Sequence, residues 1–99
     1  TACFHAQQAA EKMLKAYLIT CGIKFPFIHD LGELIDLCTR RDPDFEMIRP
    51  KGEQLTPYAV ELRYDIGFAP EWDRAQEAYE QALEIKTFVM DRLPPEMKA

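Results

Sequence analysis

The run from residue 2 to residue 21, ACFHAQQAAEKMLKAYLITC, constrains the fold of this chain more than any other stretch. It contains no glycine or proline, it is rich in residues of high helix propensity, and Gly22 follows it as a helix stop. At about 100° per residue, its apolar side chains cover one broad face of a helix. An arc this wide indicates a helix that packs against neighbours on more than one side, as the central helix of a bundle does.

The polar side chains of this predicted helix fall on two different faces. Gln8, Glu11, Lys12 and Lys15 are expected on the narrow, solvent-facing side. Gln7 instead projects into the apolar arc. Because a buried amide must find hydrogen-bond partners, Gln7 is either a satisfied glutamine of the core or of an interface, or a contact to a ligand.

A second helix is predicted for residues 30–41, with Asp30 as its N-cap. The residues after it, 42–54, contain Pro43, Pro50 and Gly52 and are expected to be the least ordered part of the chain, with one short amphipathic turn at residues 45–48. A third helix is predicted for residues 57–64, with Thr56 as its N-cap and Pro57 in its first turn.

The fourth predicted helix, residues 70–93, is the second long one. Its apolar stripe consists of Trp72, Ala75, Ala78, Tyr79, Ala82, Leu83, Ile85, Val89, Met90 and Leu93. Lys86 falls within this stripe, where a long side chain either extends its ammonium group to the surface or binds an opposite charge. Whether Gln7 and Lys86 face the core or a dimer interface stays open.

Two long helices, two or three short ones and no strand pattern predict an all-α protein, an antiparallel up-and-down bundle of four to five helices. A chain of 99 residues fits a single domain, residues 1–99. Because the helical pattern is present from the first residues, we expect that this piece lacks the start of its first helix.

Composition limits the functions that fit. A net charge of −5 argues against a protein that coats nucleic acid without selectivity. The three cysteines lack C-x-x-C or metal spacing, so we expect buried, reduced thiols in a cytoplasmic protein. His5 and His29 stand far apart, which predicts no metal site, and no glycine-rich loop indicates a cofactor. No apolar run is long enough to span a membrane.

One cluster carries recognisable binding chemistry, the segment LTPYAVELRYD of residues 55–65. It places the guanidinium of Arg63 near the phenol rings of Tyr58 and Tyr64. An arginine offers a planar fork for phosphate or carboxylate, and a tyrosine ring can stack on a base. The structural alternative is that Arg63 caps helix carbonyls or pairs with Glu61 or Asp65 while the tyrosines pack in the core.

Taken together, FHAQQAAEKMLKAYL at residues 4–18, HDLGELI at residues 29–35 and the 55–65 segment resemble the HEPN domain family (higher eukaryotes and prokaryotes nucleotide-binding). The resemblance covers nearly the whole chain. It implies a bundle of four to five helices that forms a homodimer. It also implies a partner, since many members are encoded beside a minimal nucleotidyltransferase and act with it as a toxin–antitoxin pair.

Catalytic members of that family are metal-independent ribonucleases with an arginine, four to six residues, and then a histidine. Arg63 matches the arginine, but the chain has Phe68, Ala69 and Pro70 where the histidine would fall. The resemblance therefore implies a non-catalytic member, with no catalytic residue assigned, that acts with a nucleotidyltransferase and binds a nucleotide or RNA. The expected ligand-binding residues are Tyr58, Arg63 and Tyr64, with Gln7, Gln8, Glu11 and Lys15 as polar contacts from the first helix.

Two other functions stay open. The chain could be a ribonuclease with a degenerate active site, which would use Arg63 together with Tyr64 or His29. It could also be a plain protein-interaction module whose acidic surface pairs with a basic partner.

Overall fold

The computed structural model describes residues 2–25, 27–59 and 71–94. Its helices are α1 (Ala2–Thr20), α2 (Leu31–Arg41), α3 (Arg49–Leu55) and α4 (Glu71–Met90), and the 3-10 segments η1 (Pro43–Ile48) and η2 (Thr56–Ala59) flank α3. The described residues contain no strand. The predicted all-α class, with two long helices and shorter ones, is therefore confirmed.

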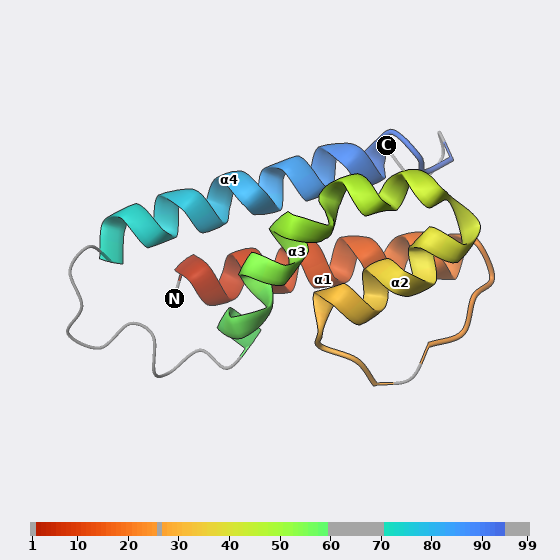
Figure 1. The fold of residues 1–99 in the computed structure, drawn as a ribbon, viewed down its shortest axis with the longest axis horizontal. Helices are drawn as coiled ribbons and strands as arrows, with labels where there is room; N and C mark the ends of the chain where they lie inside the picture. The colour runs from red at the N-terminus through yellow and green to blue at the C-terminus, as the bar shows by residue number, and fades with distance from the viewer. Residues whose placement is uncertain (1, 26, 60–70, 95–99) are drawn as a thin grey trace.

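The helices α1 and α4 lie side by side, and α2 and α3 cover one face of this pair, with α2 on α1 and α3 between α2 and α4 (Figure 1). The helix α1 ends as predicted at Gly22, whose φ of 73° lies in the left-handed region that favours glycine. The buried side chains of α1 are Cys3, Ala6, Gln7, Ala10, Glu11, Leu14, Tyr17 and Leu18. Burial on this scale fits the wide apolar arc that the sequence shows.

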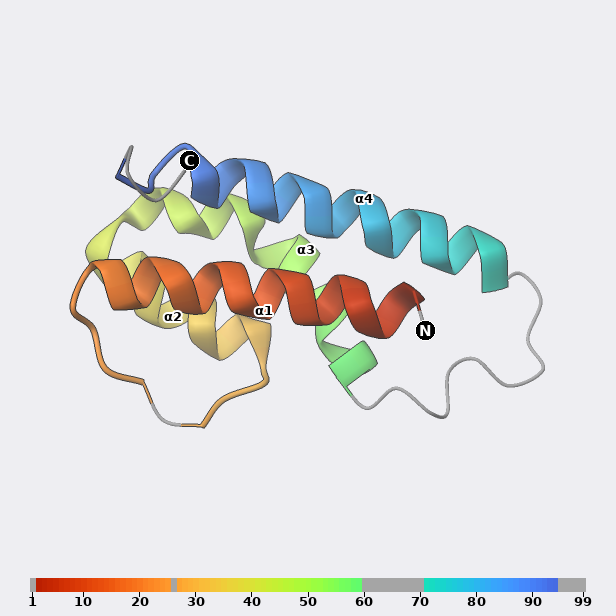
Figure 2. The same cartoon turned by 180° about the vertical axis from the view of Figure 1, so that it is seen from behind.

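The helices do not alternate strictly in direction. In Figures 1 and 2, α1, α2 and α4 run the same way and α3 runs back between them. Ring contacts agree, because Tyr17 and Phe88, from the last turns of α1 and α4, both pack on Phe45, at centroid distances of 4.5 and 5.0 Å. The predicted up-and-down order is wrong for α1 and α2, because the connection between them is extended. At about 3.3 Å per residue, this connection is long enough to run back along α1, so that α2 begins beside the first half of α1 and runs in the same direction.

The segment between α2 and residue 59 differs from the prediction. The short turn predicted at residues 45–48 is confirmed, as part of η1, but residues 49–55 form the helix α3 rather than a poorly ordered stretch. The predicted third helix at residues 57–64 is wrong where it is described, because Thr56–Ala59 is a 3-10 turn. Residues 60–64 lie outside the described residues. Pro50 falls in the first turn of α3, where a missing amide costs nothing. Gly52 is buried against α2, where a Cβ atom would lie 2.5 Å from Cδ1 of Ile35.

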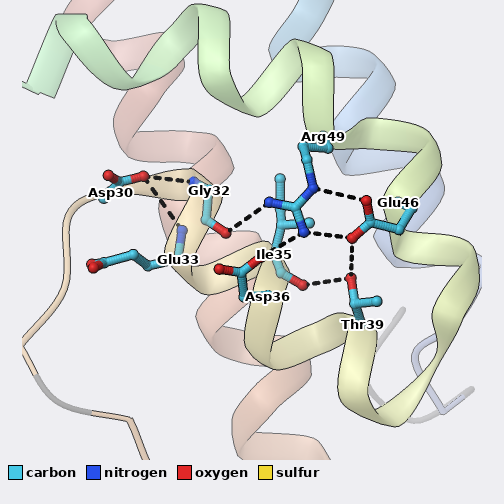
Figure 3. Close-up of polar contacts among 8 residues, drawn as sticks. All are labelled: Asp30, Gly32, Glu33, Ile35, Asp36, Thr39, Glu46 and Arg49. Carbon is cyan, nitrogen blue, oxygen red and sulfur yellow. Dashed lines mark hydrogen bonds and ion pairs between the residues drawn. The ribbon is translucent and has the colours of Figure 1, made fainter.

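Arg49 joins this segment to α2 (Figure 3). Its Nε donates to Oε1 of Glu46 at 2.8 Å, and its Nη2 donates to Oδ1 of Asp36 at 2.6 Å. Its Nη1 reaches the carbonyl of Gly32 at 3.4 Å. One guanidinium therefore connects η1 to two turns of α2.

The start of α2 is capped from two sides. Oδ1 of Asp30 accepts hydrogen bonds from the amides of Gly32 and Glu33, so the predicted N-cap is confirmed. Thr56, predicted to cap its own helix, instead accepts from the amide of Leu31 at 3.1 Å through its hydroxyl oxygen. A residue of the α3–η2 junction thus satisfies one of the unpaired amides at the start of α2.

Only part of the apolar stripe predicted for α4 is buried in the core. Its members Ala78, Ala82, Ile85, Val89 and Leu93 are buried. Tyr79 and Leu83, predicted to face inward, are 62% and 45% exposed, and Lys86 is exposed rather than in the core. The side chain of Trp72 lies outside the described part. Among the described helices, none has the length and apolar character needed to cross a membrane.

Candidate functional site

A polar cluster forms where the connection before α2 returns to α1. It consists of Gln7, Glu11, Lys15 and His29, and we call it the Glu11 cluster. The first three residues are spaced four apart on α1, so their side chains lie one above another on the helix surface. His29 comes from the end of the connection, one residue before the N-cap of α2.

The carboxylate of Glu11 is the centre of this cluster. Its side chain is only 8% exposed. Oε2 accepts from Nζ of Lys15 at 2.9 Å, and Oε1 accepts from Nε2 of Gln7 at 3.1 Å. Nδ1 of His29 lies 3.2 Å from each of the two oxygens. The sequence placed Glu11 on the solvent-facing side of the helix, and that prediction is wrong because the returning connection covers this side chain.

These contacts decide the charge state of Glu11. Burial by itself raises the pKa of the carboxyl group, because it disfavours the charged form. Hydrogen bonds from Lys15, Gln7 and His29 favour the charged form and outweigh burial, so the pKa lies below its ordinary value. Glu11 is therefore a carboxylate at neutral pH.

Gln7 is fully buried, so the prediction of a glutamine within the apolar arc is confirmed. Its Nε2 donates to Oε1 of Glu11 and to the carbonyl of His29, both at 3.1 Å. Because both partners are acceptors, the amide can have only this orientation. Its Oε1 is then a buried acceptor without a partner in the described part of the chain, which is rare in folded proteins.

Aromatic rings surround the outer side of the cluster. Nζ of Lys15 lies 5.8 Å from the ring centroids of both Phe25 and Phe27. The ring of Phe27 is 91% exposed and packs edge-to-face on His29 at 5.1 Å. An exposed ring can stack on a base, and an ammonium group beside an imidazole can bind a phosphate.

The other predicted site residues are not all described. Gln8 is half-buried on α1. Tyr58 is half-buried at the N-terminal end of α1, and burial, together with the neighbouring Cys3, raises its pKa. Arg63 and Tyr64 lie outside the described residues. The structure therefore brings together Gln7, Glu11 and Lys15 and places Tyr58 beside Cys3, one turn of α1 before Gln7.

His29 is the cluster residue that the predicted ligand-binding set lacked. Its place before Asp30 was visible in the sequence, but its partner Glu11 is eighteen positions away. No helical periodicity relates a residue of an extended connection to one in the preceding helix. The spacing of Gln7, Glu11 and Lys15 was the available signal, since residues four apart on a helix are neighbours.

The comparisons with known proteins agree with this architecture. In a comparison with protein-family models, residues 1–93 match the HEPN domain. No curated protein and no solved structure matches the chain. The family match runs from α1 past the end of α4 and so includes the residues of the Glu11 cluster. The chain therefore belongs to the HEPN domain family, which indicates a nucleotide-binding or RNase-like module.

Proposed function

We propose that this chain is a non-catalytic, dimeric HEPN-type protein that binds a nucleotide and acts with a separately encoded nucleotidyltransferase in a toxin–antitoxin-like pair. One observation carries the non-catalytic assignment. Phe68, Ala69 and Pro70 occupy the positions at which ribonuclease members have a histidine after the arginine. The motif therefore lacks the imidazole that ribonuclease members of the family use to transfer a proton.

The Glu11 cluster supports nucleotide binding. Phe27 offers an exposed ring for a base, and the Lys15 ammonium group offers donors for phosphate oxygens within the same group of contacts. Glu11 is buried beneath them and holds Lys15 and His29 in place. In this proposal Tyr58, Arg63 and Tyr64 form a second part of the same site.

Calorimetric titration with ATP, GTP and the corresponding monophosphates tests the binding. We expect Lys15→Gln and Phe27→Ala each to weaken nucleotide binding at least fivefold. Lys24→Gln is the matched control, because Lys24 is an exposed lysine of the same connection. Binding that is absent from the wild-type protein, or that Lys24→Gln weakens as much as Lys15→Gln, contradicts the assignment.

A second candidate function follows from the pair of Glu11 and His29. With its proton on Nδ1 and that nitrogen donating to the carboxylate, His29 keeps Nε2 as an acceptor, which is the arrangement of a general base. Half of the His29 side chain is exposed, so Nε2 is within reach of a substrate. A ribonuclease that uses His29 in place of the usual histidine is thus the alternative.

Incubation with unstructured RNA in EDTA separates the two functions. Cleavage that survives chelation and disappears in both His29→Gln and Arg63→Ala would establish the enzyme. No cleavage by wild-type protein that binds nucleotide would establish the non-catalytic function. The proposed partner predicts a nucleotidyltransferase gene next to this one and co-purification of its product with the chain, and a neighbourhood without such a gene contradicts it.

A further inference from the structure

The outer face of the two long helices carries an apolar groove. It lies between α1 and α4 and has a volume of about 610 Å³. Its walls are largely apolar: Ala6, Ala9 and Met13 from α1, and Tyr79, Ala82 and Leu83 from α4. The small side chains of α1 leave room for another helix to approach closely. This face lies away from α2 and α3, which pack on the other side of α1 (Figure 2).

Leu83 forms a ridge beside this groove. It also borders a second hollow of about 400 Å³, which Thr87 and Phe88 line on the other side of α4. Together with Tyr79, it is among the large apolar side chains that the protein exposes. A ridge flanked by two hollows is the shape that packs against the grooves of a second helix surface.

The charges around the groove indicate which surface fits it. Lys12 and Lys86 line the groove, and no carboxylate is among its lining residues. Within the described ranges, neither lysine belongs to an ion pair. Carboxylates outnumber cations at the exposed positions described on α4, where Asp73, Glu77, Glu80 and Glu84 accompany Arg74 and Lys86. The α4 helix of a second copy therefore offers both the apolar ridge and the carboxylates that this basic, apolar groove would accept.

We propose that two copies of the chain pair through this surface, with the α4 ridge of each copy against the α1/α4 groove of the other. The inference rests on the dimer of the proposed function and assigns its interface. A helix of about 20 residues is about 30 Å long and about 10 Å across, so two helices side by side present a face of about 600 Å² per copy. Two such faces bury at most about 1,200 Å² in total, which is the lower end of the range for specific interfaces.

Analytical ultracentrifugation over a concentration series tests the interface. We expect Leu83→Asp to raise the dimer dissociation constant at least tenfold. Met47→Asp is the matched control, because Met47 is a 70% exposed apolar residue of η1, outside the groove. It should leave the constant within threefold of wild type, and circular dichroism should show the same helix content for all three proteins.

A charge variant gives an independent measurement, which also serves if Leu83→Asp fails to fold. We expect the double change Lys12→Glu and Lys86→Glu to weaken pairing at least fivefold and to reduce its dependence on salt. Lys24→Glu, on the connection before α2, should change neither.

The outcomes separate the interface from the dimer itself. A dimer that persists unchanged in Leu83→Asp and in the lysine variant overturns the groove assignment and leaves the proposed dimer intact. A wild-type protein that stays monomeric at every concentration overturns both. Nucleotide binding is measured separately and is not decided by either result.

Discussion

Oε2 of Glu11 lies 3.2 Å from Nδ1 of His29, which joins the middle of α1 to the last residues of the connection that precedes α2. Gln7 makes a second link to the same place, because its amide donates to the carbonyl of His29. The start of α2 is thus positioned on α1 by buried polar groups as well as by apolar packing. The same groups form the inner part of the proposed nucleotide site, so stability and binding are linked there.

Glu11→Gln tests how much this link contributes. The change removes the charge that Lys15 and His29 contact and replaces one carboxylate oxygen by an amide donor, so Gln7, Lys15 and His29 share a single neutral acceptor. We expect the free energy of unfolding to fall by about 1–3 kcal/mol. Urea denaturation measures it. Glu53→Gln, an exposed glutamate of α3, is the control and should stay within about 0.5 kcal/mol of wild type.

The same carboxylate predicts a pH dependence. The pKa of Glu11 is lower in the folded protein than in the unfolded chain, so its contribution is complete above the unfolded value of about 4.3. That contribution is lost as the pH falls through the folded-state pKa. The difference in unfolding free energy between wild type and Glu11→Gln should therefore be constant near neutral pH and shrink below about pH 4. A difference that grows on acidification would contradict this assignment.

Gly52→Ala tests the close approach of α3 to α2. Alanine favours helices over glycine by about 1 kcal/mol, but its Cβ atom would lie 2.5 Å from Cδ1 of Ile35. We expect the overlap to dominate and to destabilise the protein by about 1–3 kcal/mol. Ile35→Val removes Cδ1, so the double variant should lose less than the sum of the two single changes. A more stable Gly52→Ala protein would contradict this expectation and show that the end of the Ile35 side chain can move aside at little cost.

Thr56→Val removes the hydroxyl that joins the end of α3 to the start of α2. That oxygen accepts from the amide of Leu31, and the hydroxyl donates to the carbonyl of Gly52 at 3.0 Å. Loss of a helix cap costs about 0.5–2 kcal/mol, and thermal or urea unfolding measures it. Thr20→Val is the control, because the exposed Thr20 hydroxyl bonds only a carbonyl of its own helix. Equal losses in both variants would argue against a capping role.

Much of the fold could be predicted from the sequence. Helix propensity and the stop at Gly22 delimit α1, and the cap at Asp30 marks α2. The helix α3 could not be predicted, because Pro50 and Gly52 are typical of loops. In the structure Pro50 lies in the first turn of α3, and Gly52 allows α3 to approach Ile35 of α2 closely. The residues around Gly52 in the sequence do not show that α2 packs against it.

The candidate site was predictable only within α1. The spacing of Gln7, Glu11 and Lys15 indicates side chains that meet on one helix surface. The burial of Glu11 was not visible, because it depends on where an extended connection returns. The same holds for the exposure of Tyr79 and Leu83 on α4. Their place in an apolar stripe predicts burial, but the sequence does not show which part of that stripe the core covers.

The pairing of α1 with α4 also has a kinetic consequence. These helices stand at the two ends of the described chain and yet pack against each other in the same direction. Their contact closes the longest loop in the molecule, and the entropy of closing a loop is lost before any contact compensates for it. We expect α2 and α3 to assemble on each other early and the docking of α4 to limit the folding rate, which makes this small helical protein a slower folder than its helix content indicates.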